Sequence, residues 1–290
     1  MLSGQADSMR TTSSGGKAEL QSASAQRIYD KRARDYDVSW HGSFAAHMVE
    51  LVKTKSGEDV LDLACGTGLV TFNAASLVGD TGSVTGIDVS SGMLARASEK
   101  KPAKNAANVV FFQHDITDLD SLGAISNHKF DVIICASALV LLDDPAAALK
   151  HWTTYLKPGG RLVVDAPHPR NIIAGTVLER AGRRAGFQVQ CCRDWCQSEE
   201  SLREVLQAAG LTVELVVPVA QKGEEDKYYS VDEADAYFER FAGFLAEASL
   251  SHSEAKEEAK VSFREEWMNA AEDGKVKEVD CVFVGIAHRV

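Results

Sequence analysis

The sequence contains no apolar run of about eighteen or more residues, so it offers no segment that could cross a membrane as a helix. It is also poor in positive charge, with 31 lysines and arginines against 42 acids and a formal net charge of −11. Proteins that bind DNA or RNA need a basic surface for the phosphates. The charge balance therefore predicts no nucleic-acid partner, and the lack of long apolar runs predicts no membrane partner.

The cysteines lack the regular spacing of a disulfide framework, and the N-terminus lacks the apolar stretch of a signal peptide. Cys191, Cys192 and Cys196 have no histidine at ligand spacing, so we expect no zinc site. Residues 1–24 are polar and rich in serine and glycine, which predicts a disordered tail. Together these features predict an intracellular, cytoplasmic protein without a metal.

The rest of the chain is organised around a glycine turn. Residues 60–65 form a short apolar run typical of a buried parallel strand, and Gly66 and Gly68 follow it. Without Cβ atoms these glycines let the backbone approach a ligand, and a helix starting near residue 69 would point its N–H groups at that ligand. A second strand ends in Asp88, twenty residues beyond Gly68. Its carboxylate can accept hydrogen bonds from both hydroxyls of a ribose, which predicts a nucleoside-containing cofactor.

Strand-like and helix-like patterns alternate along the sequence. This alternation predicts an α/β fold with an open, doubly wound and mostly parallel sheet covered by helices on both faces. We also expect a short helix near 119–125, a helix over 145–156, and two amphipathic helices at 231–250 and 253–271. The seven expected strands are 60–65, 83–89, 109–114, 130–136, 161–166, 211–219 and 279–289.

Four segments resemble the motifs of class I S-adenosylmethionine-dependent methyltransferases. Residues 61–68 resemble the glycine motif, 86–93 the second motif, 130–133 the fourth, and 156–162 the turn before strand five. Their order and spacing match over about 29–219, and the subgroup most resembled is the ubiquinone/menaquinone-biosynthesis type, which methylates small molecules. Residues 36–41, with Phe44, further resemble fungal natural-product enzymes, including those that methylate the thiols of gliotoxin-like dithiols.

The resemblance implies a Rossmann-like methyltransferase fold whose last strand is antiparallel. It implies an N-terminal helical lid over 25–56 and a methyltransferase domain over 57–290, with helical substrate caps inserted at about 168–197 and 220–275. Lid and caps would enclose a small molecule of the secondary-metabolite kind. Residues that could form its apolar ceiling, or merely pack the cap helices together, are Phe238, Phe241, Phe244, Leu245, Phe263 and Trp267.

The same resemblance implies S-adenosyl-L-methionine as the cofactor. Asp62 would lie near its ammonium group, Asp88 would hold the ribose, and Met93, Asp115 and the Ile116 N–H would contact the adenine. Helix capping is the alternative role for the acids, and core packing for Met93. The expected cofactor-binding residues are Tyr29, Tyr36, Trp40, Asp62, Ala64, Gly66, Thr67, Gly68, Asp88, Val89, Met93, Asp115, Ile116, Ala136 and Ser137.

Methyl transfer to a hydroxyl needs a general base, whereas a thiol, with a free pKa of about 8.5, needs less help. His41 and His168 are the candidate catalytic bases, and Asp165 is a more distant one. Either histidine could instead be a surface or packing residue. The lid aromatics would exclude water and attract the positive sulfur.

Two other functions fit parts of the sequence. An NAD-dependent oxidoreductase would also place an acid at the end of its second strand, but Thr71 stands where its third glycine would be. A protein with a methyltransferase-like fold could also bind the cofactor for regulation, without catalysis.

Overall fold

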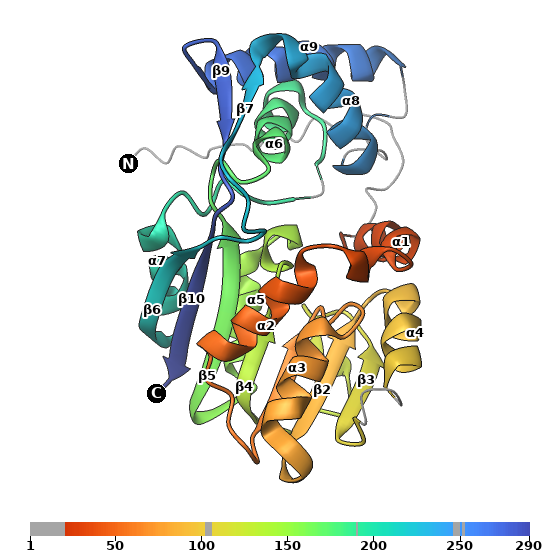
Figure 1. The fold of residues 1–290 in the computed structure, drawn as a ribbon, viewed down its shortest axis with the longest axis vertical. Helices are drawn as coiled ribbons and strands as arrows, with labels where there is room; N and C mark the ends of the chain where they lie inside the picture. Colours follow the sequence, from red (N-terminus) through yellow and green to blue (C-terminus); the bar gives the residue numbers. More distant parts are fainter. Residues whose placement is uncertain (1–20, 102–105, 190, 246–249, 251–252) are drawn as a thin grey trace, which may run out of the picture.

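A seven-stranded sheet forms the centre of the structure, a computed structural model that describes residues 21–101, 106–189, 191–245, 250 and 253–290. The strand order is β3-β2-β1-β4-β5-β10-β6 (Figure 1). β10 is antiparallel to both its neighbours, and the other paired strands are parallel, which confirms the predicted fold class. The strands are β1 (Asp59–Leu63), β2 (Ser83–Asp88), β3 (Val109–Gln113), β4 (Phe130–Cys135), β5 (Leu156–Pro167), β6 (Leu211–Val219) and β10 (Val282–Arg289).

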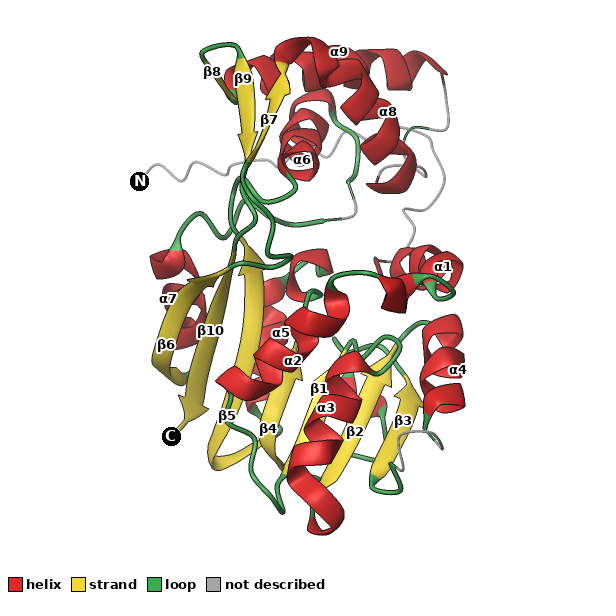
Figure 2. Cartoon of the chain, viewed as in Figure 1, coloured by secondary structure: helices red, strands yellow, loops and turns green. Residues whose placement is uncertain are grey.

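Helices cover both faces of the sheet, because the central strands are apolar on both sides (Figure 2). α2 (His41–Leu51) and α3 (Leu69–Val78) share one buried cluster with the sheet, and α5 (Pro145–Thr153) and α7 (Glu199–Ala208) belong to a second. None of the described helices is long and apolar enough to cross a membrane.

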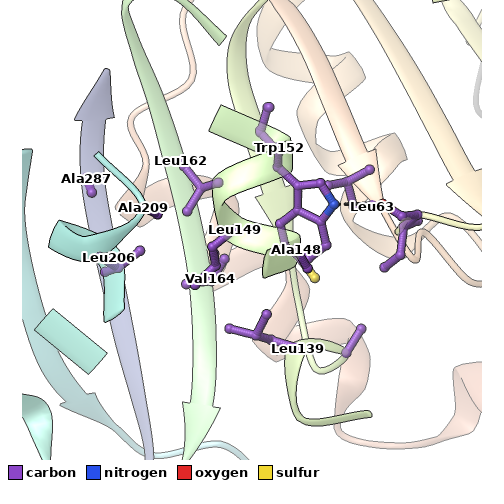
Figure 3. Close-up of a cluster of buried hydrophobic side chains, with 14 of the residues drawn as sticks. Leu63, Leu139, Ala148, Leu149, Trp152, Leu162, Val164, Leu206, Ala209 and Ala287 are labelled. Carbon is purple, nitrogen blue, oxygen red and sulfur yellow. Dashed lines mark hydrogen bonds between the residues drawn. The ribbon is translucent and has the colours of Figure 1, made fainter. Parts of the chain in front are cut away.

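The buried cluster around α5 fixes the loop that follows β3. Trp152 is fully buried in this cluster, which also contains Leu63, Leu139 and Leu149 (Figure 3). Its indole Nε1 donates a 2.7 Å hydrogen bond to the backbone oxygen of Ile116. A buried indole N–H needs such a partner. The tryptophan therefore ties the loop at the carboxyl end of β3 to the core.

The N-terminal helix packs beside the edge of the sheet. α1 (Gln21–Arg32) contacts α4 (Ser91–Lys100), which lies against β2 and β3 (Figure 1). It starts inside the segment that we expected to be a tail, and the first twenty residues of that expected tail lie outside the described residues.

A cap with its own core stands on the carboxyl side of the sheet (Figure 2). It contains α6 (Ile173–Ala185), α8 (Ala234–Leu245) and α9 (Ser253–Asn269). A small antiparallel sheet of order β7-β9-β8 completes it, formed by β7 (Lys227–Ser230), β8 (Ala271–Glu272) and β9 (Lys275–Glu278). Phe238, Phe263 and Trp267 are completely buried among these elements.

This small sheet was not predicted from the sequence. Its strands are too short to show an alternating pattern, but Asp273 and Gly274 join β8 to β9 with φ angles of 50° and 73°. An Asp-Gly pair with two positive φ angles is the preferred two-residue hairpin turn, and it was the available signal. The helix expected over 231–250 begins at Ala234, after a 3₁₀ turn capped by Ser230.

Three further elements differ from expectation. The helix expected near 119–125 is a single 3₁₀ turn, and the helix expected over 145–156 ends at Thr153. β5 starts earlier than predicted, because Leu156 already pairs with Phe130 before a register shift at the glycine-containing turn. The 3₁₀ turns are η1 (Tyr36–Val38), η2 (Gly79–Thr81), η3 (Leu119–Ser121), η4 (Leu139–Leu141) and η5 (Val231–Glu233).

Candidate active site

The carboxyl ends of the central parallel strands lie level with one another. Leu63 of β1 pairs with Ile87 of β2 and with Cys135 of β4. The loops that follow these strands therefore leave from one edge, and the strand order reverses direction between β1 and β4. Ligands of open parallel sheets bind at such a switch point.

The glycine turn has the geometry that close approach to a ligand requires. Gly66 has φ of 55°, and apart from its chain neighbours no residue has an atom within 4 Å of the position that a Cβ would take. Gly68 has φ of 83°, and a Cβ there would come within 2.8 Å of the Phe72 ring. Both φ angles are in the left-handed region, which glycine adopts without a steric penalty. The backbone at Gly66 consequently faces open space at the start of α3.

Asp88 is held in place by the turn beside it. Its Oδ2 accepts the Gly66 N–H and its Oδ1 accepts the Ser90 N–H, each at 2.8 Å. Burial raises the pKa of this carboxyl, and the two N–H donors act in the opposite direction. A carboxylate has about four acceptor positions, so each oxygen retains a lone pair. The arrangement can accept two hydroxyl hydrogen bonds from a ribose.

Asp62 lies on the other side of the turn and is almost completely buried. Burial raises its pKa to about 7, and the hydroxyl of Thr71, which donates to Oδ2, only partly offsets this. Thr71 occupies the position that a dinucleotide-binding turn gives to its third glycine. A glycine at this position could not donate this hydrogen bond to Asp62.

Replacing Asp62 with asparagine is expected to stabilise the cofactor-free protein at high pH. The unfolded chain ionises this group near pH 3.9, whereas the folded chain holds the proton up to about pH 7. Between these pH values the folded state binds more protons than the unfolded state, so the free energy of unfolding of the wild type falls as the pH rises. Above about pH 7 this loss of stability is complete and remains constant. One pKa unit corresponds to about 1.4 kcal/mol. Urea unfolding at about pH 5 and pH 8 should show the larger gain at pH 8, and an equal gain at both would contradict the prediction.

Three neighbouring cavities open at this edge and all border Ser137. The inner cavity lies between α1 and the ends of β1 to β4, and the small cavity lies beside Asp62. The large cavity, of about 660 Å³, lies between the sheet and the cap. Tyr29 borders the inner and large cavities, and His41 borders the small and large ones. A ligand that filled the inner and small cavities would meet an occupant of the large cavity beside Ser137.

Backbone strain concentrates around these cavities. Among the described residues, five that are not glycine have a positive φ, and Ala64, Ser137 and Ile172 among them line a cavity. Such conformations cost free energy and cluster at functional sites. The Ser137 N–H also donates a 2.6 Å hydrogen bond to Asp165, a buried acid on β5 that lines the large cavity.

The structure brings most of the expected cofactor-binding residues to the inner cavity. Asp62 instead lines the small cavity and Trp40 the large one. Thr67 and Gly68 line none of the three: the Thr67 hydroxyl donates to Asp37, and Gly68 begins α3. The expected residues at the inner cavity are Tyr29, Tyr36, Ala64, Gly66, Asp88, Val89, Met93, Asp115, Ile116, Ala136 and Ser137.

The two candidate histidines lie in different surroundings. His41 stacks on Trp40 with ring centres 3.8 Å apart, and burial, with the charges of Arg32 and Lys222, lowers its pKa to about 4. His168 borders none of the three cavities. Its Nδ1 accepts the backbone N–H of Arg170 at 3.0 Å, so the structure does not bring it to the other site residues.

The cap and α1 supply site residues that the sequence analysis missed. Of the expected ceiling residues with described side chains, Phe241 alone lines the large cavity. The side chains of Phe244 and Leu245 are outside the described part of the structure. Tertiary packing brings the other residues together, and no sequence motif marked them. They are Gln21, Ser22 and Ala25 at the inner cavity, and Arg193, Lys222, Lys227, Tyr229, Tyr237, Arg240 and Glu278 at the large one.

Two acids fasten the N-terminal segment over the inner cavity. Asp30 of α1 accepts hydrogen bonds from the Ser90 hydroxyl at 2.6 Å and the Gly92 N–H at 2.8 Å. Asp37, in η1, forms an ion pair with Lys100 at 2.7 Å. The segment is therefore attached to both ends of α4 through polar contacts.

Comparison with known proteins agrees with this geometry. Aklanonic acid methyltransferase DauC of Streptomyces sp. (strain C5) is 28% identical over 49% of this chain and 64% of its own length. The ubiquinone/menaquinone biosynthesis C-methyltransferase UbiE of Shewanella sp. (strain W3-18-1) is 33% identical over 53% of this chain and 62% of its own. The chain thus spans less than two thirds of the length of these curated relatives.

A solved structure shows the same fold. The cyclopropane-fatty-acyl-phospholipid synthase-like protein of Lactobacillus casei ATCC 334 superposes with a TM-score of 0.57 at 18% identity, covering 86% of this chain and 90% of that one. Residues 54–235, more than half of the chain, match the family described as methyltransferase domain. The chain therefore belongs to the methyltransferase domain family, and the cofactor that this family implies is S-adenosylmethionine.

Proposed function

We propose that this protein transfers a methyl group from S-adenosylmethionine to an oxygen or sulfur atom of a small molecule held in the large cavity. The observation that carries the proposal is the position of Ser137, which borders all three cavities. The relatives named above act, by their names, on small molecules. A cavity of about 660 Å³ is of the size that holds such ligands.

The chain's own residues fit the parts of this cofactor. The fixed Asp88 carboxylate suits the ribose hydroxyls, and Met93 and Ile116 line the inner cavity where an adenine would lie. Asp62, in the small cavity, would face the ammonium group, whose positive charge would favour the ionised carboxylate. When bound, the cofactor supplies an activated methyl group on a positively charged sulfur.

Positioning and exclusion of water are the main tasks left to the protein. Methyl transfer is an in-line displacement, so holding the acceptor atom close to the methyl carbon supplies much of the rate enhancement. Tyr29, Tyr36 and Trp40 form an aromatic wall where the cavities meet, and aromatic faces attract a sulfonium cation. Burial raises the pKa of Tyr36, so it stays a neutral phenol there.

A base for a hydroxyl acceptor is available at the same place. Asp165 lines the large cavity, and burial raises its pKa to about 7, which matches the requirement for a general base at neutral pH. His41 is the second candidate in the large cavity. A thiol acceptor depends less on a general base, because part of it is already thiolate at neutral pH. The resemblance of residues 36–41 to thiol-methylating enzymes supports sulfur, and the perturbed acid supports oxygen.

Labelled S-adenosylmethionine incubated with panels of phenols and thiols tests the proposal directly. We expect transfer of the label to at least one acceptor, and saturable binding of S-adenosylhomocysteine by calorimetry. Binding without transfer to any acceptor would favour a regulatory cofactor-binding protein. Binding of NADH without binding of S-adenosylhomocysteine would overturn the cofactor assignment.

A further inference from the structure

The large cavity carries more cations than the acidic protein around it would suggest. Five basic side chains and two carboxylates line it, although the whole chain has a formal net charge of −11. The basic side chains are those of Arg32, Arg193, Lys222, Lys227 and Arg240, and the acids are Asp165 and Glu278.

We propose that the large cavity selects an aromatic acceptor that carries a carboxylate, and that Arg193 recognises this group. The inference rests on the proposed function, because it names the substrate class of the same site. It concerns specificity: Arg193 would bind the acceptor and take no part in the methyl transfer itself.

The two carboxylates of the cavity already have partners. The Oε1 of Glu278 accepts the hydroxyl of Tyr229 at 3.0 Å, and its Oε2 accepts the N–H of Ile173 at 3.1 Å. Asp165 accepts the N–H of Ser137, and its raised pKa leaves it partly protonated near neutral pH. Among the described residues, neither acid forms an ion pair with Arg193, Lys222 or Arg240, and Lys227 pairs with Glu224 outside this set. An anionic ligand would therefore find positive charge at Arg193, Lys222 and Arg240 that no described carboxylate neutralises.

The Arg193 side chain is held in position but forms no ion pair with a carboxylate among the described residues. Its Nη1 donates a 2.7 Å hydrogen bond to the backbone oxygen of Asn171, and its backbone N–H donates to Glu179 at 2.9 Å. Its Nε is buried and has no hydrogen-bond partner among the described residues. Lys227, by contrast, pairs with Glu224 at 2.6 Å. A half-buried guanidinium is costly unless it is paired, so an anion in the cavity would remove a cost that the free protein carries.

Aromatic side chains give the same cavity flat apolar walls. Tyr229 and Tyr237 lie with ring centres 4.6 Å apart, and Tyr237 stacks on Phe241. Trp40, from the N-terminal lid, also lines this cavity. Rings favour stacking against other rings. Charge and shape together therefore favour a planar molecule with an acidic substituent over a neutral one of the same size.

The cofactor's own carboxylate is the competing partner for this arginine. Arg193 borders the large cavity and neither the inner nor the small one, where Asp88 and Asp62 lie. The two roles have different consequences, because loss of a cofactor contact weakens S-adenosylhomocysteine binding and loss of an acceptor contact does not. Cofactor affinity is therefore measured in the same experiment.

The test is calorimetry with hydroxybenzoates and mercaptobenzoates against the corresponding benzamides, on the full chain saturated with S-adenosylhomocysteine. In the wild type we expect at least one acid to bind about tenfold more tightly than its amide. Arg193→Met should remove this preference and leave S-adenosylhomocysteine affinity unchanged, and Arg193→Lys should retain part of it. The matched control is Arg184→Met, because Arg184 pairs with Glu265 and Glu266 on the cap, away from the cavities.

Equal binding of acids and amides by the wild type, or binding of neither, would overturn the inference without requiring any variant. Loss of S-adenosylhomocysteine affinity in Arg193→Met, with the acid preference retained, would assign the guanidinium to the cofactor instead. If the wild type fails to bind S-adenosylhomocysteine, the proposed function is wrong. The comparison of acids with amides on the cofactor-free chain would then still decide whether the cavity selects anions.

Discussion

Replacing Asp88 with alanine is expected to weaken S-adenosylhomocysteine binding by about 100-fold or more. Hydrogen bonds to a charged group contribute about 1.5–3 kcal/mol each, and this carboxylate is positioned to receive two ribose hydroxyls. It is already fixed by the N–H groups of Gly66 and Ser90, so it needs no rearrangement to accept them. Isothermal titration calorimetry gives the dissociation constants directly.

Asp59→Ala is the matched control for this prediction. Asp59 begins β1 at the opposite end of the strand, where it contacts Ser83 and Lys157. Removing its carboxylate should lower stability without changing cofactor affinity. Thermal unfolding of both variants separates the two effects. A similar loss of affinity in both variants, or an Asp88→Ala chain that is folded and binds normally, would show that this acid does not hold the ribose.

Replacing Asp165 with asparagine is expected to lower kcat for a hydroxyl acceptor by about 100-fold or more, the usual range for a positioned general base. A base acts only when deprotonated, and the pKa of Asp165 is about 7. Wild-type kcat should therefore rise as the pH increases through about 7 and then level off. Asparagine can still accept the Ser137 N–H, so the backbone at Ser137 keeps its partner. The variant should lose the rising limb of the profile and retain cofactor affinity.

If His41 is the general base, the pH dependence of kcat should have a different shape. Because its pKa is lowered to about 4, it would be deprotonated over the whole neutral range, and kcat would be flat from about pH 5.5 upward. A flat wild-type profile, together with full activity of Asp165→Asn and loss of activity in His41→Ala, would transfer the role of the base to the histidine. A rising profile that persists in Asp165→Asn would exclude the aspartate.

The parts of the site that could be predicted are those that depend on local backbone geometry. The glycine turn and Asp88 are separated by one strand, one helix and a turn, so a fixed spacing in the sequence produces a fixed distance in the fold. Thr71 shows the same principle, since the residue in place of a third glycine forms a specific contact with Asp62. Such short-range relations can be read from spacing alone.

The acceptor side could not be predicted in the same way. The large cavity combines residues from the lid, the sheet and both cap insertions, and their positions follow from how these segments pack. The same limit explains His168: it follows a strand end, which favoured a catalytic role, but its ring lies against Phe283. Long-range packing also decides which cap aromatics face the cavity, as Phe241 does, and which are buried, as Phe238 is.

The polar attachment of α1 has a consequence for the catalytic cycle. The inner cavity has a volume of about 70 Å³ beneath this helix, well below the ~300 Å³ at which ligand pockets begin. We therefore expect cofactor entry and product release to need a movement of α1 that breaks the hydrogen bonds from Ser90 and Gly92 to Asp30. The bond from Ser90 is partly buried, and the bond from Gly92 is exposed to solvent. If the proposed function holds, we expect the opening rate of α1, together with the methyl transfer itself, to limit turnover.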